Sequence, residues 1–167
     1  MAIGNWEYNG KEITSIQDIH KYAPKAWGFV YHFKLFDLKT RKQVYEYIGK
    51  KNLYSITNPK ITEAQYKLLK KKGNKVSRER RKTGGWTYRK NTIKESNWKT
   101  YTSSNKYIKE NKNKYIIKRE ILLFCNNDYD LKYQEAKFIL CSGALETDSS
   151  LNNGFSLRLF GNKMIEN

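Results

Sequence analysis

The sequence predicts a mixed fold in which strands and helices share one core. Apolar and aromatic residues at positions 29, 31, 33 and 35 repeat with a period of two, which is typical of a strand, and a second run rich in Val, Ile and Tyr follows at 44–49. Apolar side chains at 131, 138 and 139 instead follow a helical spacing. Because 167 residues are about one domain long, we expect a single folded domain.

The first elements are an N-terminal segment and a hairpin. Residues 1–26 mix polar residues with scattered aromatics and are expected to form an irregular segment that packs onto the domain. The runs at 29–36 and 44–49 then form a hairpin around the polar stretch 37–43.

The register of this hairpin decides whether two tyrosines meet. With a loop centred on Lys39, Tyr31 lies opposite Tyr47, so that both phenols occupy one face. A shift of one residue would separate them, because side chains alternate between the two faces of a strand.

Capping residues predict two helices in the middle of the chain. Thr62 followed by Gln65 is a capping-box signature, which predicts a helix of about ten residues through Lys71. Ser103 or Ser104 is expected to cap a second, shorter helix. The residues between these helices are expected to form a basic connector interrupted by glycines.

The last third of the chain contains a strand and the best-defined helix. Residues 115–125 are mostly apolar and are expected to form the strand. Asp128 or Asp130 is expected to cap a helix that continues to Cys141. Ser142-Gly143 predicts the end of this helix, because glycine readily adopts the left-handed conformation that follows a helix.

The charge of the chain predicts a polyanionic partner. There are 33 Lys and Arg residues against 16 Asp and Glu, a formal net charge of +17. Residues 60–119 alone hold 20 basic residues and four Glu, so the excess charge is concentrated in the middle of the chain. Such a stretch binds nucleic acid by neutralising phosphates. The 14% aromatic content exceeds that of a disordered basic tail, so we expect the domain to be folded.

Composition also excludes several classes of protein. No run approaches the roughly 18–20 apolar residues of a membrane span, and the first ten residues lack the layout of a signal peptide, so we expect a soluble, intracellular protein without a membrane partner. The two cysteines and two histidines are too scattered to form a zinc finger, a zinc deaminase centre or a histidine-rich nuclease site. Cys125 and Cys141 are expected to be reduced thiols in the core.

One carboxylate stands out in the last predicted helix. Glu135 is four residues from both Leu131 and Ile139 and therefore lies within the apolar stripe. A buried carboxylate needs a partner, which can be an ion pair, a hydrogen bond or a metal ion. These alternatives stay open on the residues alone, and Tyr31 and Tyr47 can equally be packing residues.

Several sequence blocks together resemble a known family. Gly28-Phe29-Val30-Tyr31, followed by Tyr47-Ile48-Gly49 and then by Glu135, resembles the GIY-YIG nucleases, with the first triplet relaxed. Four blocks over roughly residues 27–160 are similar to the free-standing phage homing endonucleases of the Seg type: Tyr47-Ile48-Gly49-Lys50-Lys51, Glu95-Ser96-Asn97-Trp98-Lys99-Thr100-Tyr101, Arg119-Glu120-Ile121-Leu122 and Tyr133-Gln134-Glu135.

The resemblance implies a fold, a domain organisation and an activity. The fold would be α+β, with a small antiparallel sheet flanked by helices. One nuclease domain would span residues 27–160, with a basic insert at about 58–100, an N-terminal segment at 1–26 and a tail at 161–167. The activity would be hydrolysis of DNA phosphodiesters by water with one Mg²⁺ or Mn²⁺ ion, as in a phage homing-type or nicking endonuclease acting in the host cytoplasm.

The resemblance also implies roles for individual residues. Glu135 matches the metal-binding glutamate, Tyr31 the tyrosine that activates or positions the attacking water, and Tyr47 the tyrosine near the scissile phosphate. Lys50 follows the second triplet, where family members place a Lys or His beside the nucleophile. A neighbouring ammonium is expected to lower the pKa of a phenol.

Two departures from the family pattern affect the predicted site. The arginine that usually follows the second triplet is missing from residues 55–60, and Arg78 or Arg81 of the insert, or Lys51, are the alternatives. We assign Arg81 to the catalytic set on this basis. Ser156 stands where relatives tend to have an asparagine, so that Asn152 or Asn153 is the candidate replacement.

The predicted partner is double-stranded DNA. A single site per chain predicts nicking by a monomer or dimerisation on DNA for a double-strand cut. The alternatives are a non-catalytic DNA-binding module on a decayed nuclease scaffold and an RNA-binding protein. The candidate DNA-binding residues are Lys51, Lys71, Lys72, Arg78, Arg80, Trp98, Lys99 and Ser104.

Overall fold

The computed structural model describes residues 2–154, which divide into two compact units. The main unit contains residues up to Leu53 and from Asn97 onward, and the inserted unit is Tyr54–Ser96. The inserted unit has its own strands and helix. The domain organisation with a basic insert at about 58–100 stays a prediction.

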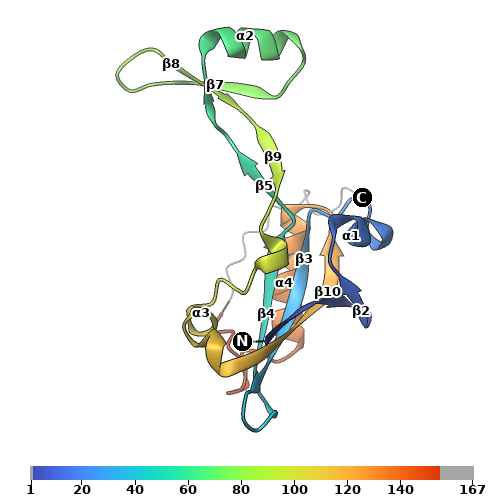
Figure 1. The fold of residues 1–167 in the computed structure, drawn as a ribbon. Helices are drawn as coiled ribbons and strands as arrows, with labels where there is room; N and C mark the ends of the chain where they lie inside the picture. Colours follow the sequence, from blue (N-terminus) through green and yellow to red (C-terminus); the bar gives the residue numbers. More distant parts are fainter. Residues whose placement is uncertain (1, 155–167) are drawn as a thin grey trace. The chain divides into compact units, whose positions relative to one another are not determined.

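The main unit is built on a five-stranded sheet with the order β2-β1-β10-β3-β4 (Figure 1). Neighbouring strands are antiparallel except for β1 and β10, which are parallel. The strands are β1 (Ala2–Tyr8), β2 (Lys11–Ile13), β3 (Gly28–Asp37), β4 (Gln43–Asn52) and β10 (Tyr115–Cys125). The α+β fold and the strand at 115–125 are thus confirmed.

The expectation of an irregular N-terminal segment is wrong. The segment forms β1, β2 and the helix α1 (Ile16–Tyr22). β1 pairs with β10 and places Trp6 in the core, where the side chain is almost fully buried. The strand was missed because Gly4, Asn5 and Glu7 interrupt the apolar residues of this short segment.

The register of the β3–β4 hairpin differs from the predicted one by two residues. Gly49, not Tyr47, lies opposite Tyr31, and Tyr47 lies opposite Phe33. The pairing shifts between Leu35 and the next residue, at an irregularity that a simple loop count does not include. Because the error is an even number of residues, Tyr31 and Tyr47 still share one face of the sheet.

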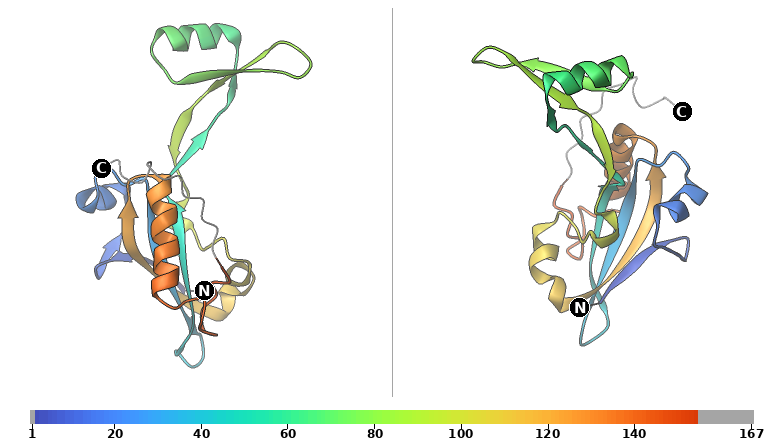
Figure 2. Two further views of the ribbon diagram at one scale, coloured as in Figure 1. Left: turned by 180° about the vertical axis from the view of Figure 1, so that it is seen from behind. Right: turned by 45° about the horizontal axis from the view of Figure 1, so that its top comes forward.

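The two faces of the sheet have different coverings. One face carries an aromatic core, which includes Phe29, Phe33 and the buried indole of Trp98 from the short 3-10 helix η1 (Trp98–Thr100). The other face packs against α4 (Asp128–Cys141), which lies across the sheet in the left view of Figure 2. The residues of this second cluster are Val30, Ile48, Cys125, Leu131, Ile139 and Ala144.

Two helices of the main unit are capped by asparagines rather than by the predicted residues. Asn127 caps α4 and Asn105 caps α3 (Lys106–Asn111), each through its side-chain oxygen, so Asp128, Asp130, Ser103 and Ser104 are not the caps. Asparagine caps as well as aspartate or serine does, so residue type alone does not distinguish neighbouring candidates. The helix α4 ends as predicted, at Ser142, before Gly143 with a φ of +66°.

The two cysteines have different environments. Cys125 is buried, as expected, and burial raises the pKa of its thiol. Cys141 is exposed, so the expectation of a core thiol is wrong for this residue. It lies at the solvent side of the last turn of α4, beside the exposed Leu140.

The inserted unit contains two small sheets and one helix. β5 (Tyr54–Thr57) pairs with β9 (Thr92–Glu95), and β6 (Lys60–Ile61), β8 (Trp86–Lys90) and β7 (Val76–Arg80) form a three-stranded sheet. α2 (Glu63–Lys71) begins at Thr62 with the predicted capping box to Gln65, which is confirmed. The prediction of a basic connector after α2 is wrong, because residues 76–80 and 86–90 pair as the strands β7 and β8.

Within residues 2–154, the helices are too short or too polar for any of them to cross a membrane.

Candidate active site

A pocket of about 420 Å³ lies at the β4 edge of the main unit. Tyr47 and Lys50 of β4 line it together with Glu135 of α4. The remaining lining residues are Asn105, Ile139, Leu151, Asn152, Asn153 and Gly154. Three of the predicted catalytic residues therefore meet in one pocket, although they are up to 88 positions apart in the sequence.

Glu135 is held on the sheet side of α4. Its side chain is only 15% exposed and forms an ion pair with Lys50, whose Nζ donates a hydrogen bond to Glu135 Oε2. Leu131 and Ile139, one helical turn away on either side, are buried against the sheet and fix the orientation of this face. The partner that a buried carboxylate requires is thus Lys50 in this structure.

Tyr31 and Tyr47 form an aromatic pair beside the pocket. Their ring centroids are 6.2 Å apart. Tyr31 is fully buried, and its hydroxyl makes no hydrogen bond within the described residues. A buried hydroxyl without a well-formed hydrogen bond is costly. The groups closest to forming one are the hydroxyls of Tyr101 and Ser103, both of which influence the pKa of Tyr31.

The glycine of the second triplet makes this pairing possible. A Cβ atom on Gly49 would lie 2.6 Å from Tyr31 Oη and 2.8 Å from Tyr47 Cε1, closer than side chains approach one another. Gly28 has a similar role at the start of β3, where a Cβ would lie 2.6 Å from Leu131 Cδ2. The two glycines are therefore explained by close packing around the tyrosines and α4.

The pKa values of the two tyrosines are raised, whereas the sequence predicted that a neighbouring ammonium would lower them. Burial raises the pKa of Tyr31 well above its usual value and also raises the pKa of Tyr47. The charge of Glu135 raises the pKa of Tyr47 further, while hydrogen bonding with Ser104 opposes the rise. The expected lowering by an ammonium is wrong, because Lys50 is paired with Glu135 and burial dominates at both phenols. Both tyrosines are neutral at pH 7.

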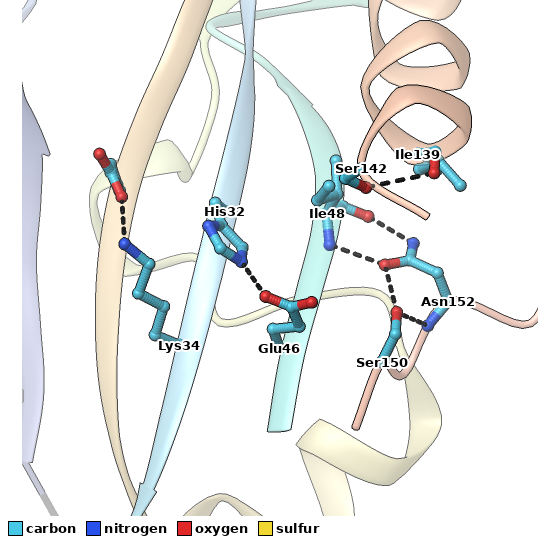
Figure 3. Close-up of polar contacts among 9 residues, drawn as sticks. His32, Lys34, Glu46, Ile48, Ile139, Ser142, Ser150 and Asn152 are labelled. Carbon is cyan, nitrogen blue, oxygen red and sulfur yellow. Dashed lines mark hydrogen bonds and ion pairs between the residues drawn. The ribbon is translucent and has the colours of Figure 1, made fainter. Parts of the chain in front are cut away.

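Asn152 fastens the chain after α4 to the edge of the sheet (Figure 3). Its side-chain oxygen accepts a hydrogen bond from the Ile48 amide at 2.8 Å, and its Nδ2 donates to the Ile48 carbonyl at 2.7 Å. Glu46 makes backbone hydrogen bonds to Ser149 and Leu151 at the same edge. Asn153 is exposed at the pocket, and Ser156 lies outside the described residues.

The segment before α3 covers the tyrosine pair from the aromatic side of the sheet. Tyr101 lies 6.0 Å from the Tyr31 ring, and Lys51 Nζ lies 4.2 Å from the Tyr101 centroid. Lys51 also donates to Asn97 Oδ1 at 2.7 Å, and burial lowers the pKa of its ammonium. Ser103 is buried with a φ of +142°, a strained backbone for a residue other than glycine.

A buried arginine fixes this segment to the sheet. Arg119 of β10 donates to the carbonyls of Gly4, Lys99 and Tyr101 at 2.7, 2.8 and 3.2 Å, and burial lowers its pKa to about 10. Tyr101, Ser103 and Arg119 were not among the predicted site residues. The signal for Tyr101 and Arg119 was their presence in the blocks that resemble the Seg type.

The predicted DNA-binding residues fall into different environments. Trp98 is fully buried, and Trp6 Nε1 donates to its carbonyl at 2.9 Å, so its indole belongs to the core and is not presented to DNA. Lys99 and Ser104 are exposed on the main unit. The predicted residues that are exposed on the inserted unit are Lys71, Lys72, Arg78, Arg80 and Arg81.

The replacement for the missing family arginine stays a prediction. Arg81 belongs to the inserted unit, where its Nε donates to Thr87 Oγ1 at 2.9 Å. Lys51 belongs to the main unit and lies on the same face of the sheet as the tyrosine pair.

The pocket has a donor set that suits a hard divalent cation. Among residues 2–154 there is no group of three or more His, Cys, Asp or Glu side chains that could enclose a metal. Mg²⁺ commonly takes one or two carboxylates and completes its shell with water and substrate phosphate. Glu135 and the exposed Asn153 fit this kind of site, in which the cation would compete with Lys50 for the carboxylate.

One comparison with known proteins identifies a family for this chain. A family model described as "Putative endonuclease segE, GIY-YIG domain" matches residues 6–165. No curated protein and no solved structure matches the chain. The matched region contains both triplets, Glu135 and the inserted unit, and nucleases with this domain generally use divalent metals and act on DNA. The chain belongs to the family of SegE-type GIY-YIG endonucleases.

Proposed function

We propose that this protein is a Mg²⁺- or Mn²⁺-dependent endonuclease that cleaves duplex DNA by direct attack of water on a phosphodiester. The observation that carries the proposal is the meeting of Tyr47, Lys50 and Glu135 in one pocket, next to the unpaired hydroxyl of Tyr31. Simple binding of DNA requires none of these four side chains at a recessed edge of the sheet.

The tyrosines act as neutral hydrogen-bond donors in this proposal. Their raised pKa values keep both phenols protonated at pH 7, so each can orient a water molecule or a phosphate oxygen. The buried Tyr31 is rigidly placed and makes no competing hydrogen bond within residues 2–154. Orientation of the attacking water is therefore its proposed role, and contact with the scissile phosphate is that of Tyr47.

Glu135 and Lys50 supply the charges. Glu135 would hold the divalent metal through its carboxylate, with water and a phosphate oxygen as further ligands. The chemistry that the metal supplies when bound is Lewis-acid polarisation of the phosphate. Lys50, released from its ion pair, places a positive charge where negative charge develops on the phosphate oxygens.

The biological setting proposed is that of a phage homing-type or nicking endonuclease. A monomer with one pocket would cut one strand, and two copies on DNA would cut both. Lys51, Lys99 and Ser104 of the main unit and Lys71, Lys72, Arg78 and Arg80 of the inserted unit are the proposed DNA contacts, and Arg81 is retained as a candidate for the missing arginine.

The test is cleavage of supercoiled plasmid DNA with Mg²⁺ or Mn²⁺ by the full chain. Glu135→Gln keeps the size of the side chain and should reduce the rate at least about 100-fold, as expected for loss of a group that stabilises the transition state. Glu146→Gln, which neutralises an exposed carboxylate of the main unit, is the control and should cleave normally. Equal cleavage by both variants would refute the assigned site.

A second candidate function is a non-catalytic DNA-binding module. The Lys50–Glu135 ion pair favours it, because the carboxylate already has a partner without any metal. Under this alternative, the wild-type protein binds duplex DNA but cleaves none of the DNA tested with Mg²⁺ or Mn²⁺.

A further inference from the structure

The inserted unit has an unusual density of positive charge. Its 43 residues include 13 Lys and Arg against three Glu, a net charge of +10. Two of the three carboxylates are already paired, Glu63 with Lys67 on α2 and Glu79 with Arg89 across the sheet. Most of the cations of this unit are therefore available to an external anion.

The β7–β8 hairpin distributes its charged residues unequally between its two faces. Arg80 lies directly opposite Trp86, and Arg78 lies opposite Tyr88, so these four side chains share one face. The other face carries Glu79 and Arg89, whose side chains approach to 3.7 Å, and Arg89 also donates to the Asn58 carbonyl. Only the first face combines arginines with aromatic rings.

The first face is partly covered and partly open. Tyr66 of α2 packs against Tyr88, with ring centroids 4.8 Å apart, and covers that part of the face. Trp86 stays 44% exposed, and the Arg78 guanidinium lies 4.6 Å from its ring centroid. No carboxylate within residues 2–154 pairs with Arg78 or Arg80. An exposed indole beside two unpaired guanidinium groups is a surface that lacks its partner.

We propose that the face formed by Arg78, Arg80 and Trp86 is a docking surface for duplex DNA. The choice of DNA as partner rests on the proposed function, and the choice of surface rests on charge and geometry. Guanidinium groups match phosphate oxygens in two-point contacts. An exposed indole has an apolar ring face that can pack against a deoxyribose of the backbone. Arg78 and Arg80 bind backbone phosphates, and Trp86 packs against the adjacent sugar.

This surface acts independently of the chemistry at Glu135. Phosphate contacts of this kind hold any DNA sequence and depend steeply on salt concentration. They require neither a metal ion nor the catalytic pocket. The inserted unit would thus hold DNA of any sequence, while the main unit carries out the cleavage.

The experiment measures binding of the full chain to a fluorescent 30-base-pair duplex by anisotropy, in EDTA and over a range of salt concentrations. The double variant Arg78→Gln/Arg80→Gln removes two charges from the proposed surface. The charge-matched control is Lys11→Gln/Lys39→Gln, at two exposed positions of the main unit. Trp86→Ala is compared with Leu68→Ala, another exposed apolar residue of the inserted unit.

The proposal predicts a specific pattern. The arginine variant should lower the slope of log affinity against log salt by about two, and the lysine control should leave it unchanged. Trp86→Ala should weaken binding about tenfold, Trp86→Phe should restore most of it, and Leu68→Ala should bind normally. The circular dichroism spectra of the arginine and Trp86 variants should match that of the wild type. A loss of affinity would then be due to lost contacts with DNA and not to unfolding of the hairpin.

Three results would overturn the proposal. One is equal loss of affinity in the arginine variant and the lysine control, which would mean that only total charge matters. Another is normal binding by Trp86→Ala and by the arginine variant. The third is tighter binding to an RNA duplex or to heparin than to DNA. Failure of the proposed function is seen separately, as absence of cleavage by a wild-type protein whose binding follows the predicted pattern.

Discussion

The two units of this protein are stabilised by different means. In the main unit, large side chains such as Trp6, Phe33 and Ile117 are fully or almost fully buried on the sheet. In the inserted unit, all of whose residues the structure describes, only Thr87 is buried. The helix α2 has no buried residue. Strand pairing, a capping box and contacts between exposed rings hold the inserted unit together. A catalytic pocket needs rigid packing, whereas a surface that grips a polyanion needs only correctly spaced charges.

The unit with the smaller buried core also has the higher density of positive charge. The inserted unit carries +10 in 43 residues, and the remaining 124 residues carry 20 Lys and Arg against 13 Asp and Glu, a net charge of +7. Repulsion among like charges opposes compact folding, so we expect the inserted unit to be the less stable of the two. Bound phosphates would relieve this repulsion and stabilise it.

The largest effect is expected from truncating equivalent leucines in the two units. Leu35 on β3 is fully buried, whereas Leu68 on α2 is 55% exposed. Leu35→Ala should lower the free energy of unfolding by about 2–5 kcal/mol, because it removes buried methyl groups and leaves a cavity. Leu68→Ala should change it by no more than about 0.5 kcal/mol. Urea unfolding followed by circular dichroism measures both values.

Similar losses in the two leucine variants would contradict the contrast between the units. Such a result would mean that α2 packs more tightly than its exposure indicates. A second leucine pair sharpens the reading: Leu53, fully buried at the end of the main unit, should behave like Leu35 when changed to Ala, and the exposed Leu140 should behave like Leu68.

A smaller but more local effect is expected at the glycine between the two tyrosines. A Cβ on Gly49 would overlap Tyr31 and Tyr47, so Gly49→Ala should cost about 1–3 kcal/mol of stability through overpacking. It should also reduce DNA cleavage strongly, because both phenols must move. Gly4→Ala is the matched control, since the nearest atom to its new Cβ would be the Ile117 carbonyl oxygen at 3.7 Å, an ordinary contact.

Stability and plasmid cleavage are measured on the same Gly49 preparation. A folded Gly49→Ala protein that cleaves at the wild-type rate would show that the tyrosine geometry does not matter for the reaction. DNA binding in EDTA should be unaffected, because the proposed docking surface belongs to the inserted unit. Loss of binding as well would indicate that DNA is held mainly by the main unit.

Much of the fold follows from local sequence signals, and the exceptions share a cause. The capping box at Thr62, the strand at 115–125 and the end of α4 at Gly143 depend on a few adjacent residues, and the structure has them as predicted. β1 and the hairpin register depend on partners far along the chain. Pairing with β10 supplies what the sequence of β1 lacks. The β3–β4 register differs by two residues from the predicted one, and the hairpin contains a one-residue irregularity next to Leu35.

The candidate site shows the same division. The positions of Tyr31, Tyr47, Lys50 and Glu135 came from the resemblance, and their meeting depends on packing between β4 and α4. The protonation of the tyrosines could not be predicted from a nearby lysine, because burial and the Lys50–Glu135 pair exist only in the folded chain. Trp98 shows the reverse error, since an aromatic residue in a basic stretch is a core residue here.

The smallest expected effect distinguishes the capping boxes of the two units by pH. In the main unit, Ser15 caps α1 and the reciprocal partner is Asp18, whereas in the inserted unit Thr62 caps α2 and the partner is the neutral Gln65. Hydrogen bonding with Ser15, then with Lys21 and the Thr14 amide, lowers the pKa of Asp18. A lowered pKa in the folded state means that this carboxylate stabilises the protein above its unfolded pKa of about 3.9, and that the contribution is lost as the pH falls below that value.

The measurement is urea unfolding of wild type, Asp18→Ala and Gln65→Ala between pH 7 and pH 3. The difference in midpoint between wild type and Asp18→Ala should be constant from pH 7 to about pH 5. It should then shrink, because Asp18 takes up a proton in the unfolded chain before it does so in the folded protein. The difference for Gln65→Ala should not depend on pH, because an amide does not titrate. A pH-independent difference for Asp18→Ala would mean that the α1 capping box works through the size of its partner and not through charge. The next residue to test for an acid-dependent contribution would then be Glu63 of the inserted unit, whose pKa is lowered by its hydrogen bond with Lys67.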